Sequence, residues 1–240
     1  MMDAKELGQF VVPTDVTPER LPGVLVQACL DLMDQRQRSL TTDGVLLTWI
    51  VLQYAINFDQ PVVPGMTLNL SGLPYRRDHH VSLRTVYVTD QQQQRVVTIR
   101  SVWGLLNQSS RTLTRLDDAA LGLPEGLPIR RVDRLHFPRI TTAIGITRPV
   151  GLRPDDIDHN QHLHNTRYFD LAMGMLPPEQ FQLYWCEQID IRFRREIVAG
   201  DQPRIMTGRA DSTVVVQRFC VDDNNVAELV TRWRRRDGNA

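Results

Sequence analysis

The feature that most constrains the fold is an order of hydrophobic patterns that occurs twice along the chain. Each half starts with a short strand pattern and continues with a segment whose apolar residues recur at steps of three and four, as in a helix. Strand-like segments with a period of two follow. Such a helix buries its apolar stripe by lying across the concave face of an antiparallel sheet. The sequence therefore predicts an α+β protein of two tandem units, each a helix across a curved antiparallel β-sheet.

The first unit is predicted to cover residues 1–125. A short strand is expected at 10–12, followed by a helix that Thr17 caps, with Pro18 in its first turn and its end near Arg38. Five strands are expected after it, near residues 45–56, 66–74, 80–89, 94–106 and 111–116. The glutamines at 91–94 are expected to form the tip of a hairpin.

Residues 126–143 are predicted to link the two units, because prolines, glycines and poor periodicity interrupt the strand pattern there. The second unit is predicted to cover residues 144–240. Its helix is expected at 166–175, where the Pro177-Pro178 pair ends it. Its strands are expected near residues 144–152, 183–197, 203–210, 213–221 and 225–236.

Composition excludes several classes of function. The chain has 240 residues and a formal net charge of zero, so no overall field attracts it to nucleic acid or to an anionic membrane. Cys29, Cys186 and Cys220 are far apart and form no CxxC pair, which argues against a disulfide framework and favours a reducing compartment. Neither a signal sequence nor a run of 18 apolar residues is present. We therefore expect a cytoplasmic protein that is neither exported nor anchored.

The candidate functional side chains concentrate in residues 156–168, DIDHNQHLHNTRY, which hold three of the six histidines. His159, His162 and His164 offer one alternative, a metal site. These three histidines lie on a loop, and no other segment offers a further metal ligand at helical spacing. Catalysis without metal or cofactor is therefore the preferred interpretation.

This stretch resembles a motif of the acyl-acyl-carrier-protein (acyl-ACP) thioesterases of bacterial type. Residues 156–165 are similar to the D-x-N-x-H-V-N-N motif of that family, and residues 193–196, FRRE, resemble its Y-R-R-E motif. Weaker similarities in the first half are Trp49, Pro64-Gly65 and Trp103. The resemblance spans about residues 8–236. It implies a double hot-dog fold and hydrolysis of a fatty acyl thioester on acyl carrier protein.

Carried over by position, the catalytic residues of the family fall on Asp158, Asn160, His162 and Glu196. An imidazole titrates near neutral pH and can take a proton from water. Either His162 or Glu196 can be the base. Asp158 and Asn160 would position the substrate carbonyl, the water or His162. Backbone N–H groups near Asn165 are candidate donors to the oxyanion.

Further residues are expected to contact the substrate or its carrier. Asn165, His164 and Tyr168 are the candidates for the acyl substrate, although Asn165 can equally be a helix cap and Tyr168 a core residue. The expected partner is acyl carrier protein with its phosphopantetheine-linked acyl chain, and the protein itself is expected to be a monomer or homodimer. The acidic surface of the carrier protein would dock on the basic side chains of Arg192, Arg194 and Arg195. The alternative is that these arginines only form a solvated basic strand.

Two positions depart from the family pattern. His164 replaces the first Asn of the N-N pair, and Ile197 follows Glu196 where some members carry a cysteine, so a thiol nucleophile is excluded there. Two rival functions stay open: a catalytically silent binding module for acyl chains or carrier protein, and a hot-dog dehydratase of 3-hydroxyacyl chains.

Strand parity adds a structural expectation. Alternation along the strand sends Glu196 to the face opposite that of Ile189, Ile191 and Phe193. A bulge between Phe193 and Glu196 is therefore predicted, because it would return Glu196 to the site.

Overall fold

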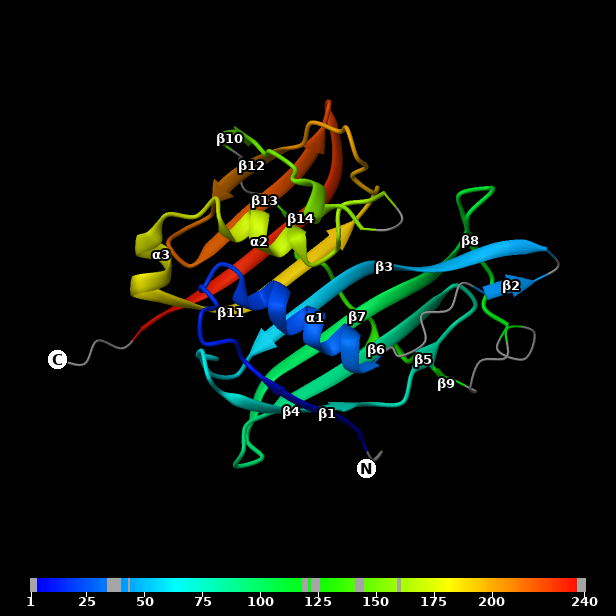
Figure 1. Cartoon of the computed structure of the whole chain (residues 1–240), viewed down its shortest axis with the longest axis horizontal. Coiled ribbons are helices and arrows are strands. Elements are labelled where there is room, and N and C mark those ends of the chain that lie inside the picture. Colours follow the sequence, from blue (N-terminus) through cyan, green and yellow to red (C-terminus); the bar gives the residue numbers. More distant parts are fainter. Residues whose placement is uncertain are drawn as a thin grey trace.

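The computed structural model describes residues 4–33, 40–42, 44–117, 121, 126–140, 145–158 and 161–236. These residues form one long, curved antiparallel sheet with helices on its inner face (Figure 1). The main strand order is β1-β4-β6-β7-β3-β11-β14-β13-β12-β10, so β1, β4, β6 and β7 lie on one side of the β3–β11 pair and the strands of the second half lie on the other.

The first half supplies helix α1 (Leu21–Met33) and the sheet up to β3. Its main strands are β1 (Lys5–Val11), β3 (Val45–Phe58), β4 (Thr67–Gly72), β6 (Val81–Thr89) and β7 (Arg95–Asn107). Short strands are β2 (Leu40–Thr42), β5 (Arg76–Arg77), β8 (Thr112–Thr114) and β9 (Leu127–Pro128).

The second half supplies helices α2 (Arg167–Met173) and α3 (Pro178–Leu183). Its strands are β10 (Ile146–Pro149), β11 (Tyr184–Phe193), β12 (Arg204–Arg209), β13 (Val214–Val221) and β14 (Asn224–Arg235). Two 3₁₀ turns are η1 (Arg131–Asp133) and η2 (Pro154–Asp156). No helix among the described residues is long and apolar enough to span a membrane.

The longer strands overlap the predicted segments, although β1 already begins at Lys5 and the short strands β2, β5 and β9 were not predicted. The start of the first helix was predicted wrongly. The carbonyl of Thr17 accepts the N–H groups of Arg20 and Leu21 at 3.0 and 3.1 Å in a separate turn, and α1 begins only at Leu21. Its predicted end near Arg38 lies outside the described residues. The sequence also gave no signal for α3, in which Pro178 starts a new helix instead of only ending the previous one.

The predicted linker carries structure of its own. Within it, β9 pairs in parallel with β5, and Asp133 of η1 forms an ion pair with Arg76 at 3.4 Å. Residues 127–133 are therefore bound to the first half, whereas the Phe137 ring already lies under Arg192 of β11 at 4.4 Å and 141–143 lie outside the described residues. The boundaries of the two units stay a prediction.

A pair of strands and a pair of helices join the halves. Strands β3 and β11 pair from Asn57↔Gln188 to Gln53↔Arg192. In front of them α1 and α2 lie against each other (Figure 1). A Cβ atom at Gly23 would come within 2.5 Å of Asp170 Oδ1 and 3.0 Å of the Thr166 carbonyl. Glycine is therefore needed at this helix contact.

An aromatic cluster fills the core between the halves. Tyr54 of β3 contacts Phe169 of α2 and Phe193 of β11, with ring centroids 6.0 and 6.4 Å apart. Tyr168 stands edge-on to Phe193 at 5.0 Å. Both units therefore share one hydrophobic core.

A buried carboxyl group lies at the junction of the halves. Asp190 of β11 is 2% exposed, and the side-chain amide of Gln188 donates to its Oδ2 at 2.7 Å. Burial raises the pKa of this carboxyl to about 6, although the Gln188 hydrogen bond and the charge of Arg232 oppose the shift. In the unfolded chain an aspartate titrates near 3.9, so the folded state loses stability as the pH rises from about 4 to about 6.

We expect Asp190→Asn to stabilise the protein more at neutral than at acidic pH, because it removes the cost of a buried carboxylate. The gain should be larger at about pH 7.5 than at about pH 4.5, by on the order of 2 kcal/mol. Urea unfolding of both proteins at the two pH values measures the difference. Equal effects at both values would contradict the raised pKa.

Candidate active site

The sequence motif forms a tight loop before α2. Asp158 donates its N–H to the His162 carbonyl at 2.8 Å, and its Oδ1 accepts the N–H of His162 at 3.1 Å. Gln161 closes the turn with a φ of 65°. Asp158 therefore positions the backbone of His162. His159 and Asn160 lie outside the described residues.

A second set of bonds ties this loop to the segment after β11. The N–H of Leu163 donates to the Ile197 carbonyl at 2.7 Å, and His162 forms an isolated bridge with Val198. These bonds bring the two predicted motifs together. His162 Nε2 lies 3.3 Å from Glu196 Oε2, and both side chains are about one quarter exposed, at 23% and 29%.

The chain departs from regular pairing just before Glu196, as parity predicts. The N–H groups of Arg194 and Arg195 both donate to the Val226 carbonyl, at 2.8 and 3.1 Å. Two residues therefore face one, which is the geometry of a bulge and turns Glu196 toward His162. The predicted irregularity between Phe193 and Glu196 is confirmed.

The end of β3 resembles the end of β11. Each strand ends in a phenylalanine, Phe58 or Phe193. The next residue, Asp59 or Arg194, donates its N–H to the neighbouring strand, with Asp59 reaching the Val96 carbonyl at 2.9 Å. Three residues beyond the phenylalanine stands Pro61 in the first half and Glu196 in the second.

The first half contributes a cation that the sequence analysis missed. Arg111, in the turn between β7 and β8, donates from Nη2 to the same Oε2 of Glu196 that faces His162. Its φ of 56° is in the left-handed region, and its N–H donates to the Asn107 carbonyl at 2.9 Å. Arg111 is 85 positions away from Glu196 in the sequence. Because the chain contains many arginines, nothing in the sequence singles out Arg111 as a site residue.

These groups open into a pocket of about 690 Å³ between the two halves. Strand β3 provides residues 48–52, and the second half provides Asp158, His162, Glu196 and the ring of Tyr168. The Tyr168 hydroxyl accepts the N–H of Ile197 at 3.4 Å. Burial raises the pKa of this phenol, so it stays neutral at physiological pH.

Asn165 and His164 have different surroundings. Asn165 lines the pocket, and the N-cap of α2 is Thr166, so the alternative of Asn165 as the helix cap is wrong. The Nδ1 atom of His164 lies 2.9 Å from Thr166 Oγ1, and the backbone N–H of His164 donates to the Asp156 carbonyl. His164 is absent from the residues that line the pocket, and its ring holds the start of the helix.

The three predicted docking arginines have acidic partners within the chain. Arg192 and Arg194 contact Glu228 at 2.5 and 2.8 Å, and Arg195 lies 3.7 Å from Asp201. The Glu228 side chain is 4% exposed, and this burial alone would raise the pKa of its carboxyl group. The hydrogen bonds from the guanidinium groups of Arg194 and Arg192 outweigh that effect and lower the pKa. Arg194 and Arg195 also line the pocket.

No three His, Cys, Asp or Glu side chains gather as metal ligands in the part of the chain that the structure describes. What the site brings together is an imidazole and a carboxylate in contact, with a guanidinium on the carboxylate. Such a pair can accept a proton from water and return it to a leaving group.

Comparison with known proteins matches both halves. The model of the acyl-ACP thioesterase N-terminal domain matches residues 29–122, and that of the C-terminal domain matches residues 145–235. A palmitoyl-acyl carrier protein thioesterase of Cuphea hookeriana is 23% identical over 158 residues, which are 62% of this chain and 38% of that protein. The chain thus spans about two fifths of the length of this curated relative.

Solved structures share the fold. A 12:0-ACP thioesterase from Umbellularia californica superimposes with a TM-score of 0.76 and 17% identity, covering 95% of this chain and 96% of the other. A putative oleoyl thioesterase from Lactobacillus plantarum gives a TM-score of 0.78 and 18% identity, covering 99% and 97%. The predicted double hot-dog fold is confirmed. Because the two family models together match most of its length, the chain belongs to the acyl-ACP thioesterase family.

Proposed function

We propose that the protein hydrolyses the thioester of a fatty acyl group on acyl carrier protein, giving free fatty acid and carrier protein without a covalent intermediate. The observation that carries this proposal is the 3.3 Å contact between His162 and Glu196 in the pocket between the halves. Family membership supports the substrate class.

His162 is the better candidate for the base. The carboxylate of Glu196 already accepts a hydrogen bond from the guanidinium of Arg111, so its Oε2 atom is occupied by a cation. Among the described residues the imidazole of His162 has no such bond to a cation. Glu196 then orients the ring and stabilises the imidazolium that forms.

The proposed reaction has two steps. Water loses a proton to His162 while its oxygen bonds to the thioester carbonyl carbon. The tetrahedral intermediate then collapses, the carbon–sulfur bond breaks, and the imidazolium returns the proton to the departing sulfur. Asp158 keeps His162 in place through its backbone N–H. Asn165 lines the pocket and is our candidate donor to the oxyanion. On the ground of the sequence motif alone, we propose that Asn160 positions the substrate carbonyl, the water or His162.

The acyl chain would lie along the apolar part of the same pocket. Trp49 and Val51 of β3, Leu113 of β8 and Phe193 of β11 line it. Tyr168 borders this wall with a neutral, buried ring. We propose Tyr168 as a contact for the acyl group, and His164 as a residue that acts through the start of α2.

Removing either member of the central pair should abolish turnover. For His162→Ala and for Glu196→Gln we expect a loss of about 100-fold or more in kcat, the usual scale of general acid–base catalysis. Release of free thiol from a panel of acyl-ACP thioesters measures it. His136→Ala, which removes an exposed histidine outside the site, is the matched control.

The same assay separates the rival functions. Full thiol release by both site variants would refute the assignment of His162 and Glu196. Acyl-ACP binding by the native chain without thiol release would indicate a silent module. Loss of water from a 3-hydroxyacyl chain with its thioester intact would indicate a dehydratase.

Arg111 should matter although it comes from the other half. Arg111→Met removes the guanidinium that holds Glu196, and we expect kcat to fall about tenfold, as for the loss of one charge-assisted hydrogen bond. Arg115→Met is the control, because that arginine faces His79 at 3.4 Å instead of the site. Equal kcat values for both variants would show that Arg111 plays no part.

We further propose that the carrier protein docks at the rim formed by Arg194 and Arg195, next to Arg192. Arg195→Glu should raise KM for acyl-ACP about fivefold, and less at high salt, because it reverses a charge at the pocket edge. KM for the acyl-N-acetylcysteamine thioester, which lacks the carrier protein, should stay unchanged. The control is Arg234→Glu, at an exposed pair with Glu187. A rise in KM for both substrates would contradict docking.

A further inference from the structure

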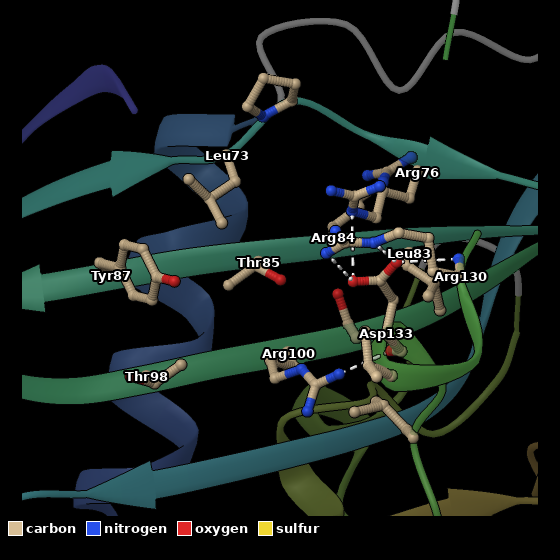
Figure 2. Close-up of a pocket in the computed structure, with 14 residues that line it drawn as sticks. Leu73, Arg76, Leu83, Arg84, Thr85, Tyr87, Thr98, Arg100, Arg130 and Asp133 are labelled. Carbon is tan, nitrogen blue, oxygen red and sulfur yellow. Dashed lines mark hydrogen bonds and ion pairs between the residues drawn. The ribbon is translucent and has the colours of Figure 1, made fainter. Parts of the chain in front are cut away.

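A second pocket lies on the outer face of the first half, away from the proposed catalytic pair. Its volume is about 430 Å³. Figure 2 shows its floor on strands β6 and β7, with α1 behind the sheet and the segment around η1 along one side. Nothing in the proposed hydrolysis uses this pocket, so the inference stands independently of it.

Strand alternation explains why this floor is polar. Val86 and Val88 of β6 are buried in the core on the α1 side. Thr85 and Tyr87 alternate with them and therefore point to the outer face. Their cross-strand partners on β7 are Arg100 and Thr98. Two hydroxyl-bearing threonines, a phenol and a guanidinium thus form one patch, as seen in Figure 2.

Positive charge exceeds negative charge around this patch. Of the 14 residues that line the pocket, four are arginines and Asp133 is the one acid; the arginines are Arg76, Arg84, Arg100 and Arg130. Arg84 stands two residues before Val86 and points to the core side, so the other three arginines and Asp133 give the patch a charge of about plus two.

Asp133 is already occupied by two of the arginines. Arg130 donates to its Oδ2 from Nε and to its Oδ1 from Nη2, both at 3.0 Å, and Arg76 lies 3.4 Å from Oδ1. These bonds, above all that from Arg130, lower the pKa of Asp133 to about 2. The carboxylate is therefore ionised at neutral pH and serves to anchor η1.

Arg100 and Arg84 are held in different ways. Arg100 donates from Nη2 to the backbone carbonyl of Asp133 at 2.6 Å, which fixes its guanidinium but neutralises no charge. Arg84 points to the core side of the sheet, where its guanidinium stacks on Trp103 at 4.4 Å and on Trp49 and Tyr75 at 5.3 Å. The positive charge that faces the patch therefore comes from the other arginines.

We propose that the pocket binds a phosphate monoester. A phosphate carries a charge of about −1.5 to −2 at neutral pH and three acceptor oxygens, so it matches the excess charge better than a carboxylate does. Arg100 and Arg76 would supply charged donors, and the hydroxyls of Thr85 and Thr98 would supply neutral ones. The remaining space beside Tyr87 fits the organic part of the ester.

The pocket is separated from the proposed active site by one stacked pair. Arg84 lines the outer pocket and stacks on Trp49, and Trp49 lines the pocket that holds His162. An occupant of the outer pocket would therefore lie next to a wall of the acyl site without entering it.

Titration calorimetry on the full chain at low ionic strength tests the proposal. The probes are inorganic phosphate, pantetheine 4′-phosphate and adenosine 3′,5′-bisphosphate, with unphosphorylated pantetheine as the negative control. We expect saturable binding of all three phosphates at one site and none of pantetheine. The ester that binds more tightly identifies the organic group that the pocket accepts, pantetheine or a nucleoside.

Matched variants assign the binding to this pocket. Arg100→Gln should weaken each phosphate about tenfold, as expected for a lost charge-assisted contact. Arg204→Gln removes the same charge from β12 of the second half, at an exposed pair with Asp223 outside the pocket, and should leave affinity unchanged. Thr98→Val keeps every charge, and weaker binding by this variant supports the proposal even if Arg100→Gln folds poorly.

Three results would overturn the proposal. The first is no saturable binding of any phosphate up to about 10 mM, a range that includes very weak ligands. The second is equal weakening by Arg100→Gln and Arg204→Gln, which would indicate general electrostatic attraction. The third is binding of pantetheine as tight as that of its phosphate ester.

Discussion

The pairing of β3 with β11 is the interaction on which the rest of the structure depends. Without it, each half would expose a long edge strand with unpaired N–H and C=O groups in the middle of the present sheet. With it, the turn that carries Arg111 faces the segment that carries Glu196, although 85 positions separate them. The candidate active site is therefore a property of the joined sheet and is absent from either half alone. The shared aromatic core around Tyr54 and Phe169 keeps this junction rigid.

Within the joined sheet, three local features orient the side chains that we propose as catalytic. Asp158 and His162 close a loop on themselves through two hydrogen bonds. The double donation to the Val226 carbonyl rotates the chain so that Glu196 leaves the outer face. The guanidinium of Arg111 then holds the carboxylate beside the imidazole. Each feature fixes one partner by backbone geometry or by charge, so little ordering is left for the moment of reaction.

Much of the fold could be read from the sequence, because periodicity survives in strands that bury one face. The bulge before Glu196 was also predictable, since strict alternation and the family motif disagreed there. The start of α1 was not, because Thr17 has the chemistry of a cap but uses its carbonyl in a separate turn. Arg111 was not either, since its role comes from a left-handed turn and from pairing between distant strands. The position of His164 depends on Thr166, which motif comparison leaves out.

The likeness between the ends of β3 and β11 has a consequence for protein design. After Phe58 and Phe193 the backbone leaves each strand through a bond to its neighbour, yet the position three residues on is Pro61 in one case and Glu196 in the other. The two halves thus share one backbone arrangement at these strand ends, and of the two positions only the one in the second half carries an acid. The end of β3 borders a small apolar pocket of about 160 Å³ that includes Pro61, Phe58 and Phe181. Such a position is where a protein engineer would begin to install a second acidic site.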